Sequence, residues 1–422
     1  MESETVKTRS LPSVLRMFLT GTVVMGLLAV AAEFICARWL GLDRIPYNGM
    51  TLGSKLDFAD LAMFPPRFDH FHTTDFFSHA WGSDFLYPAP IAVLYWMFHL
   101  FPDDVNFFLA FVSLCFVCLT GWLFRELRRR GVAVAGAAVF ASLSLVFSYP
   151  AYFEFNRANM EIFVWGLSAL GILLLVRNRP WMAAVCIGLA GACKGYPFFY
   201  LGLFLMRKRY REMIFSLLVG AVANVVSLWA VAGNFGVGRA GTAAGLDEFQ
   251  QLYVLRRRAN EMGLDHSIFG FVKRFWVNLP SPERLQRGLW GYLVTAGLIA
   301  IGVFLWRLRK LPVINQVLFV TVTCITLPPT SYDYTLLHLY TPWVMIVFFA
   351  VEAWKNEQVI PRELWPVCIC FMVLLSAQSE MIWHGERVEA QIKCVVLLVL
   401  AALAAWKPLG NRLELDPARA VA

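Results

Sequence analysis

The stretch VNFFLAFVSLCFVCLTGWLF at residues 105–124 runs directly into RELRRR at residues 125–130. The first segment holds about 20 residues without a formal charge, the length that an α-helix needs to cross the hydrocarbon core of a bilayer. The second segment holds four arginines, and arginines gather at the cytoplasmic ends of membrane helices. Together the two segments predict a membrane-spanning helix that ends in the cytoplasm.

The rest of the chain repeats this pattern. Its 422 residues are 59% hydrophobic and 16% charged, whereas a soluble domain carries about 25% charged residues. The apolar blocks lie at about 15–40, 88–101, 105–124, 132–148, 161–176, 181–193, 197–206, 213–232, 289–306, 312–328, 335–354, 364–378 and 394–406. Backbone polar groups inside a bilayer must be satisfied within the segment, so these blocks are expected to be helices. A membrane barrel would alternate polar and apolar residues, and these blocks do not. We therefore predict an all-α polytopic membrane protein.

Short basic loops set the predicted orientation. The block at 88–101 has only about 14 residues, which suits an interfacial or re-entrant helix. If it does not cross, the basic loops share one side: Arg125 to Arg130, Arg177 and Arg179, Arg207 to Arg211, Arg307 to Lys310, Lys355 and Arg362, and Lys407 and Arg412. That side is cytoplasmic by the positive-inside rule, which gives a single domain, 1–422, of about 12 transmembrane helices with both termini inside. Segments 41–104, with interfacial helices, and 233–288 then form long extracytoplasmic loops.

Charge and cysteine usage exclude several classes of protein. The formal charge is +8, but most Lys and Arg residues lie at helix ends, so we do not predict nucleic-acid binding. The nine cysteines lie in or beside apolar blocks, which argues against a disulfide framework and a zinc site. The sequence shows no phosphate-binding loop of the Walker or dinucleotide type and no metal-ligand motif. Most of the unusual polar residues lie on the predicted outer face, so chemistry or recognition is expected there, without a cofactor.

Two acidic residues follow the first apolar block. Asp57 and Asp60 lie in LDFADLAMF, about 15 residues beyond that block. A carboxylate at a membrane surface can act as a general base, which takes the proton of a hydroxyl group as its oxygen attacks. The alternative is a helix cap or a solvated loop acid, and the spacing alone leaves both open.

A second cluster lies where the chain enters the block at 161–176. The segment FNRANME carries Arg157, Asn159 and Glu161. Ionisable groups at this depth are costly and are usually functional. Arg157 and Glu161 are also spaced i,i+4, so a simple ion pair along one helix is the other interpretation.

The corner CKGYP joins the short blocks at 181–193 and 197–206. Each block is too short to span a bilayer easily, and broken helices at membrane depth mark ligand sites in many membrane proteins. Lys194 at this corner needs an anionic partner, and a lipid phosphate would serve; Tyr196 lies beside it. The alternative is that Lys194 snorkels to the surface.

Two further segments complete the candidate site. Arg256 and Arg257, followed by His266, form a basic segment with affinity for anionic headgroups. The segment LPPTSYDYTLLH places Ser331, Asp333 and Tyr334 at a helix mouth, with His338 one turn deeper on the same face. A lone histidine inside a membrane is often only a packed residue, so the role of His338 stays open.

In this order, the segments resemble the GT-C glycosyltransferases, and most of all glycosyltransferase family 87, the polyprenol-phosphate-mannose-dependent mannosyltransferases. The residues that carry the resemblance are Asp57-Phe58, Tyr87-Pro88-Ala89-Pro90, Asn159, Glu161, Lys194, Pro197, His266-Ser267 and Pro329-Thr330-Ser331-Tyr332-Asp333. The resemblance covers most of the chain up to about residue 345. The order of the segments is more specific than any one of them.

The resemblance implies a membrane fold of the GT-C type with outer-loop helices over a cavity. It implies an inverting transfer of a sugar, most simply mannose, from a polyprenyl phosphate to a glycolipid or glycan acceptor at the outer face of a bacterial inner membrane. The family's base corresponds to Asp57, with Asp60 as the fallback, and its phosphate ligand to Lys194. The family usually has Trp and then His near the last motif, where this chain has Tyr332 and Tyr334. That departure bears on the role of His338 and on the choice of sugar and acceptor.

Two other classes of protein remain in competition. A transporter or lipid flippase would show internal repeats and ionisable groups at the middle of the membrane, and neither is evident here. A scaffold subunit of an envelope-polysaccharide system would keep the fold and leave Asp57 inert.

Overall fold

The computed structural model describes residues 10–39, 59–62, 65–78, 85–256, 263–275, 281–376, 382–383 and 386–410. This part of the chain is dominated by helices, and its two short strands, β1 (Ile382–Trp383) and β2 (Glu386–Arg387), pair with each other in antiparallel fashion. The predicted all-α architecture is confirmed.

Six of the described helical segments are long and apolar enough to cross a membrane. They include α1 (Ser13–Arg38), α5 (Asp104–Arg129), α11 (Tyr210–Ala232), α15 (Pro282–Trp306), η6 (Asp333–Leu339) continued by α17 (Tyr340–Lys355), and α19 (Glu389–Trp406). Counting the pair α6 (Val134–Ser144) and α7 (Tyr149–Arg157), which meet at a bend of 46°, as one span gives up to seven.

Shorter apolar helices occupy the remaining predicted blocks. They are α4 (Ala89–His99), α8 (Glu161–Val176), α9 (Pro180–Cys193), η3 (Tyr196–Tyr200) with α10 (Leu201–Met206), α16 (Val313–Thr326) and α18 (Leu364–Leu375). The described helices thus establish a helical membrane protein, and the total of about twelve spans stays a prediction.

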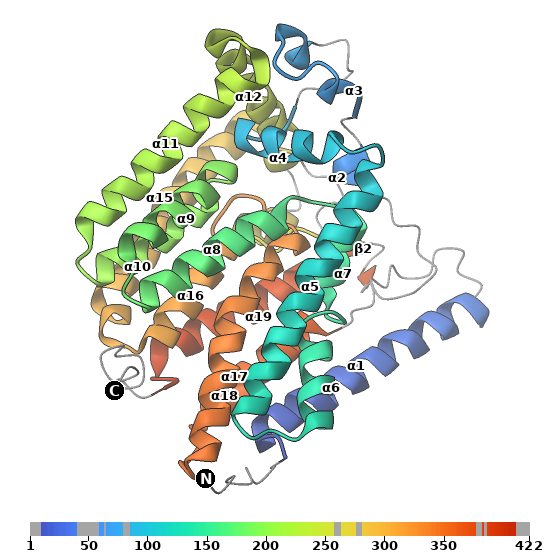
Figure 1. Ribbon diagram of the computed structural model, residues 1–422, viewed down its shortest axis with the longest axis vertical. Coiled ribbons are helices and arrows are strands. Elements are labelled where there is room, and N and C mark those ends of the chain that lie inside the picture. The colour runs from blue at the N-terminus through green and yellow to red at the C-terminus, as the bar shows by residue number, and fades with distance from the viewer. Residues whose placement is uncertain are drawn as a thin grey trace, which may run out of the picture.

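Helix η5 (Leu308–Lys310) continues the candidate span of α15. Short helices outside the candidate spans complete the described fold: α2 (Ala59–Ala62), α3 (Pro65–Phe68), η1 (Thr74–Phe77), α12 (Phe235–Phe249), η4 (Gln250–Val254) and α14 (Ile268–Phe275). Figure 1 shows α11, α9, α10 and α15 on one side of the molecule and α1, α5 and α6 on the other. In the same view α12, α3 and α4 lie together at the top.

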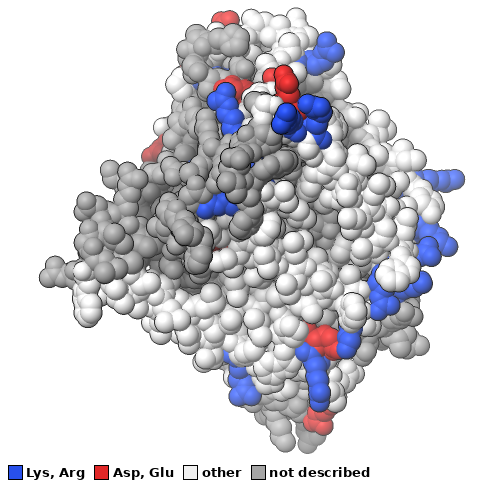
Figure 2. Space-filling view, turned by 180° about the vertical axis from the view of Figure 1, so that it is seen from behind, with Lys and Arg blue, Asp and Glu red and all other residues white. Residues whose placement is uncertain are grey.

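The long helices present apolar side chains outward. Leu27 of α1, Val117 of α5 and Leu298 of α15 are each more than 60% exposed. A soluble protein rarely exposes a continuous apolar surface of this extent, whereas a bilayer solvates it. Figure 2 shows one broad uncharged face of the molecule, with most of the visible lysines and arginines around it.

Basic side chains at helix ends contact acidic side chains or backbone carbonyls of neighbouring helix ends. The contacts are Arg130 with Glu352 (3.7 Å), Lys407 with Glu363 (3.0 Å), the Arg207 guanidinium donating to the Leu175 carbonyl, and the Arg307 guanidinium donating to the Trp406 carbonyl (2.5 Å). Each contact joins two of the loops that the charge pattern assigns to the same side of the membrane.

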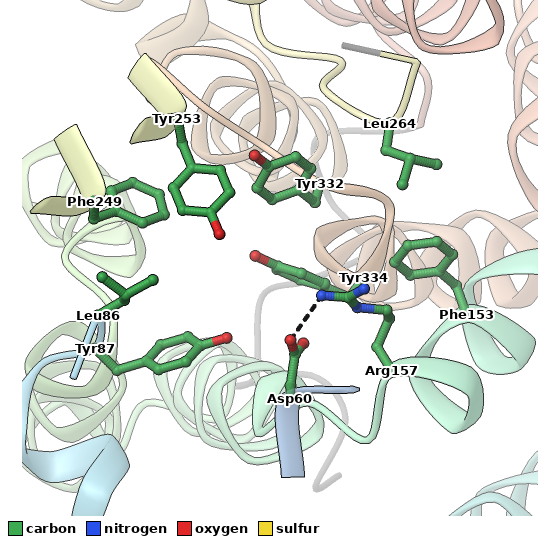
Figure 3. A pocket seen from close by; sticks show the side chains of 10 residues that line it. All are labelled: Asp60, Leu86, Tyr87, Phe153, Arg157, Phe249, Tyr253, Leu264, Tyr332 and Tyr334. Carbon is green, nitrogen blue, oxygen red and sulfur yellow. Dashed lines mark hydrogen bonds and ion pairs between the residues drawn. The ribbon is translucent and has the colours of Figure 1, made fainter. Parts of the chain in front are cut away.

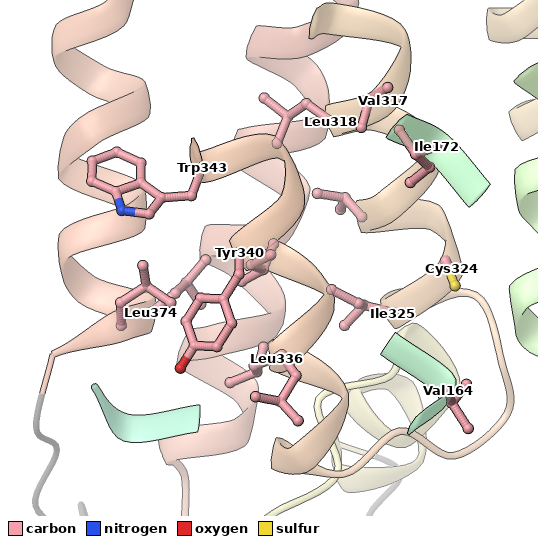
Figure 4. Packing of buried hydrophobic residues seen from close by; sticks show 14 of the residues in the cluster. Val164, Ile172, Val317, Leu318, Cys324, Ile325, Leu336, Tyr340, Trp343 and Leu374 are labelled. Atoms are coloured by element: carbon pink, nitrogen blue, oxygen red, sulfur yellow. The ribbon is translucent and has the colours of Figure 1, made fainter. Parts of the chain in front are cut away.

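Aromatic side chains hold the helices together at the centre. Trp343 of α17 is fully buried, and its ring lies 4.3 Å from that of Phe18 on α1 and 4.8 Å from that of Phe371 on α18. Next to it, apolar side chains of α8, α16 and η6 fill the space between helices, as Figure 4 shows around Ile325 and Leu336. This core positions α8, which begins at the candidate residue Glu161, and α16, which ends shortly before the candidate residues Ser331 and Asp333.

Helices α9 and α11 cross at two glycines. A Cβ atom on Gly188 would lie 2.4 Å from the Ser216 carbonyl oxygen, and one on Gly220 would lie 3.1 Å from the Gly188 carbonyl oxygen. Small residues at a membrane-helix crossing let the two backbones approach closely. The contact holds α9 in place, and α9 ends beside Lys194.

We expect Gly188→Ala to lower the free energy of unfolding by about 1–3 kcal/mol, because the added methyl group meets a backbone atom that cannot turn away. Thermal unfolding of the detergent-solubilised protein measures the effect. Gly166→Ala on α8 is the matched control, since a Cβ atom there has nothing within 4 Å. Equal melting temperatures for the two variants would contradict the close crossing.

Candidate functional site

A cavity of about 150 Å³ opens between segments that are far apart in the sequence. It is lined by Asp60, Leu86, Tyr87, Phe153, Arg157, Phe249, Tyr253, Leu264, Tyr332 and Tyr334. In Figure 3 the Asp60 carboxylate and the hydroxyl groups of Tyr87, Tyr253 and Tyr334 point toward the same space. The lining therefore combines one carboxylate, one guanidinium and several tyrosines.

A tight backbone turn between α7 and α8 positions the charged groups. Helix α7 ends at Arg157, and Ala158 adopts a left-handed conformation (φ 50°) that stops it. An alanine in this conformation costs about 1–2 kcal/mol, so the surrounding contacts must hold it there. The turn directs Arg157, Asn159 and Glu161 into one polar region.

The Asp60 carboxylate is held from both sides. The Arg157 guanidinium donates to its Oδ1 atom at 2.8 Å, and the Asn159 amide donates to its Oδ2 atom at 2.7 Å. Asp60 is only 4% exposed, and each carboxylate oxygen keeps a second lone pair for another donor. The ion pair between Arg157 and Glu161 that the sequence spacing allows is replaced by the pair between Arg157 and Asp60.

Lys194 is buried at the break between α9 and η3. Its Nζ atom donates to Glu161 Oε2 at 2.7 Å and to Asn159 Oδ1 at 2.8 Å. The same atom lies 4.4 Å from the centre of the Tyr334 ring. The broken helix is confirmed, and the anionic partner of the lysine in this structure is Glu161. Snorkelling to the surface does not occur.

Glu161 connects three distant segments. Its Oε1 atom accepts a hydrogen bond from the Tyr196 hydroxyl group and lies 2.8 Å from Nε2 of His338. The Nδ1 atom of His338 lies 3.1 Å from the Tyr200 hydroxyl group. Glu161 and His338 are fully buried. The predicted residues 159–161, 194–196 and 338 therefore form one network, which reaches the cavity through Asn159 and Asp60.

Asp333 forms a second buried cluster beside the cavity. Its carboxylate accepts hydrogen bonds from Tyr149 (2.5 Å) and Lys393 (2.7 Å) and lies 3.2 Å from Nδ1 of His266. Ser331 contacts the other ring nitrogen of His266 at 3.2 Å. The structure thus brings Asp333, His266 and Ser331 together, although the sequence analysis assigned His266 to donor binding and the other two to the substrate cavity. None of the three is among the residues that line the cavity.

Burial also raises the pKa of two groups near the site. Burial raises the pKa of Asp265, whose Oδ1 atom accepts hydrogen bonds from the backbone N–H groups of Ser267 (3.0 Å) and Ser331 (2.9 Å). Burial, followed by the nearby Asp60 carboxylate, raises the pKa of the Tyr87 hydroxyl group. Tyr87 is therefore a hydrogen-bonding neutral group at neutral pH.

Some predicted residues are not placed in the site. Asp57 and Arg257 lie outside the described residues, and Arg256 is exposed and is not among the lining residues. The sequence analysis missed Phe249, Tyr253 and Lys393. Nothing in their sequence neighbourhood distinguishes these residues from the many other aromatic and basic residues at helix ends.

Within the described ranges, no three His, Cys, Asp or Glu side chains are grouped as they would be to hold a metal ion. The groups that face the cavity are hydrogen-bond donors, aromatic rings and a single carboxylate. Such a lining can bind a polyhydroxylated ligand and accept a proton from it.

The helices and the cavity define an all-helical membrane protein with a charged, tyrosine-rich pocket at its helix ends. The model of glycosyltransferase family 87 matches residues 85–331, more than half of the chain. The protein therefore belongs to glycosyltransferase family 87 and is a glycosyltransferase. A comparison with the curated proteins found no match. The matched segment includes Arg157, Glu161 and Lys194, whereas Asp60 and Lys393 lie outside it.

We expect Lys194→Met to lower the free energy of unfolding by about 3–5 kcal/mol, because it leaves the Glu161 carboxylate buried without its cation. Melting in detergent measures the loss. The control is Arg129→Met, which breaks an exposed ion pair with Glu126 and should cost at most about 1 kcal/mol. If Lys194→Met and Arg129→Met have the same melting temperature, the buried pair does not stabilise the fold.

Proposed function

We propose that the protein is an inverting glycosyltransferase that moves a hexose, mannose being the first candidate, from a polyprenyl-phosphate donor to a hydroxyl group of a glycolipid or glycan. The observation that supports this most directly is that the Asp60 carboxylate and the Arg157 guanidinium, 2.8 Å apart, line the same cavity. The carboxylate can take a proton, and the guanidinium can bind a phosphate.

Asp60 is the proposed base. The acceptor hydroxyl oxygen attacks the anomeric carbon of the donor sugar from the face opposite the phosphate, and its proton passes to the Asp60 carboxylate. The bond between that carbon and the phosphate oxygen breaks at the same time, so the configuration inverts and the lipid phosphate leaves with the electron pair. The hydrogen bonds from Arg157 and Asn159 orient the carboxylate for this step.

Arg157 is the proposed primary ligand of the phosphate. Its side chain is 35% exposed, and its planar fork suits phosphate oxygens. Lys194 supports it from behind the Tyr334 ring, although Glu161 already balances the charge of this lysine. Positive charge near the leaving oxygens stabilises the transition state as negative charge develops there. Arg256, Arg257 and His266 remain predicted contributors to donor binding.

The tyrosines are the proposed sugar contacts. Their rings present apolar faces, and their hydroxyl groups can exchange hydrogen bonds with sugar hydroxyls. A cavity of about 150 Å³ suits the sugar end of the donor, while a polyprenyl chain is better solvated by the bilayer around the uncharged face of the protein. Asn159, Glu161, Tyr196 and His338 do not line the cavity and would support it through the network that ends at Asp60.

We expect Asp60→Asn to lower the transfer rate by about 10²–10⁴-fold, because the amide keeps the shape of the carboxylate and cannot accept the proton. The assay uses purified protein, polyprenyl-phosphate mannose and lipid extract as the source of acceptor. Asp69→Asn is the matched control in the same loop, since Asp69 is exposed and pairs with His99 at 2.9 Å.

Asp57→Asn in the same assay separates the two candidate bases. A large loss in Asp57→Asn with near wild-type transfer in Asp60→Asn would return the role of base to Asp57. Full activity in both variants would refute a base in this loop. Absence of transfer by the wild type with any polyprenyl-phosphate sugar would refute the proposed donor class.

We further propose that the site faces away from the cytoplasm of a bacterial inner membrane, with about twelve spans. In a background without native cysteines, a membrane-impermeant maleimide should label Ala240→Cys in intact cells. It should label Arg129→Cys only after permeabilisation. Residues 129 and 240 are both exposed in the folded protein, so burial of the introduced cysteine does not limit either labelling reaction. The reverse pattern would place the cavity on the cytoplasmic side.

A further inference from the structure

Three of the four segments that meet at Asp333 also line the cavity. Asp333 itself lies between Tyr332 and Tyr334, which are both lining residues. Tyr149, which donates to Asp333, lies on α7, the helix that supplies Phe153 and Arg157 to the lining.

The third segment is the loop of His266, which also carries the lining residue Leu264. The backbone N–H of His266 donates to the Ser331 carbonyl at 2.9 Å, and Asp265 forms an isolated β-bridge with Tyr332. The Asp333 carboxylate therefore lies where three parts of the cavity wall are joined.

The fourth segment is α19, and none of the described lining residues lies on it. It supplies Lys393, which is 1% exposed and whose Nζ atom lies 2.7 Å from Asp333 Oδ2. The same Nζ atom lies 4.3 Å from the centre of the Tyr149 ring. A lysine buried this completely is costly unless it is paired and hydrogen-bonded, and its charge is directed at the joint of the cavity wall.

A series of aromatic rings connects Tyr149 with the cavity lining. The centre of the Tyr149 ring lies 6.0 Å from the centre of the Phe153 ring. The Phe153 ring centre in turn lies 6.3 Å from that of Tyr334. Tyr334 in turn lies 6.0 Å from Tyr332, which lies 6.4 Å from Tyr253. Asp333 is thus flanked by two rings of the cavity lining, and its partner Tyr149 is connected to the lining through Phe153.

We propose that Lys393 is a positioning residue for sugar transfer. Its ion pair with Asp333 fixes the wall that carries Tyr332 and Tyr334, which makes the C-terminal helix α19 part of the functional unit. This inference rests on the proposed function for its kinetic consequence. Its structural consequence, an anchored segment at residues 329–339, can be measured without any substrate.

The kinetic test uses the purified full-length protein with Lys393→Met, Lys393→Arg and the control Lys407→Met. Lys407 also pairs with a carboxylate at 3.0 Å, but it lies at the exposed end of α19. Lys393→Met should raise the KM for the polyprenyl-phosphate sugar by about 10–100-fold, because misplaced contacts weaken binding of substrate and transition state alike. The kcat should change less, since Asp60 and Arg157 are untouched. Lys393→Arg keeps the positive charge and should have a KM close to the wild-type value.

A merely structural role gives a different result. Partial unfolding removes active molecules, which lowers the apparent kcat and leaves the KM unchanged. If Lys393→Met does not fold, the double variant Asp333→Asn with Lys393→Met removes both charges and leaves neither buried without its partner. It should fold and still show the raised KM.

Hydrogen exchange provides the substrate-free measurement. Amide exchange in residues 329–339 should be faster in Lys393→Met than in the wild type, and unchanged in Lys407→Met. Wild-type KM and wild-type exchange in Lys393→Met would overturn the proposal. If the wild type transfers no sugar, the proposed function fails, and the exchange experiment still decides whether Lys393 anchors the cavity wall.

Discussion

The ion pair between Glu161 and Lys194 is the interaction on which the arrangement of this site depends. Both residues are buried among apolar helices, and an unpaired charge there would be far more costly than any single packing contact. To satisfy the pair, α8 must begin beside the point where α9 breaks, and Asn159 must bridge toward Asp60. The close glycine crossing of α9 with α11 and the left-handed turn at Ala158 are the backbone conditions for that meeting.

The polar groups form two buried clusters, and each adjoins the cavity. One extends from Asp60 through Asn159 to Glu161 and His338, and the other surrounds Asp333. In both clusters a lysine balances a carboxylate, so the charges inside the apolar bundle are largely compensated. Arg157 is the cation that remains partly exposed beside the cavity. This distribution supports the proposal of a hydroxyl-rich ligand group that carries a phosphate at one end.

The two clusters differ in how many of their residues lie within the segment matched by the family model. The Glu161 cluster takes its partners mainly from within residues 85–331, whereas Asp333 and Lys393 lie beyond that segment. Helix α19 approaches the site with its first turns only and leaves the rest of its length to packing and lipid contact. The proposed role of Lys393 would make α19 necessary for the cavity through one side chain that is not among the lining residues.

The sequence by itself determined the helical membrane architecture, because blocks of apolar residues bounded by arginines have few other solutions in a bilayer. It also indicated the family and most of the charged site residues, since Arg157, Glu161 and Lys194 stand out in apolar surroundings where charge is costly. Only the tertiary structure decided which charges pair, because partners such as Asp60 and Arg157 are separated by many residues and by helix directions that no local pattern encodes. The same holds for Tyr253 and Lys393. Tyrosines and lysines are common at helix ends, and their roles follow only from what the folded chain places opposite them.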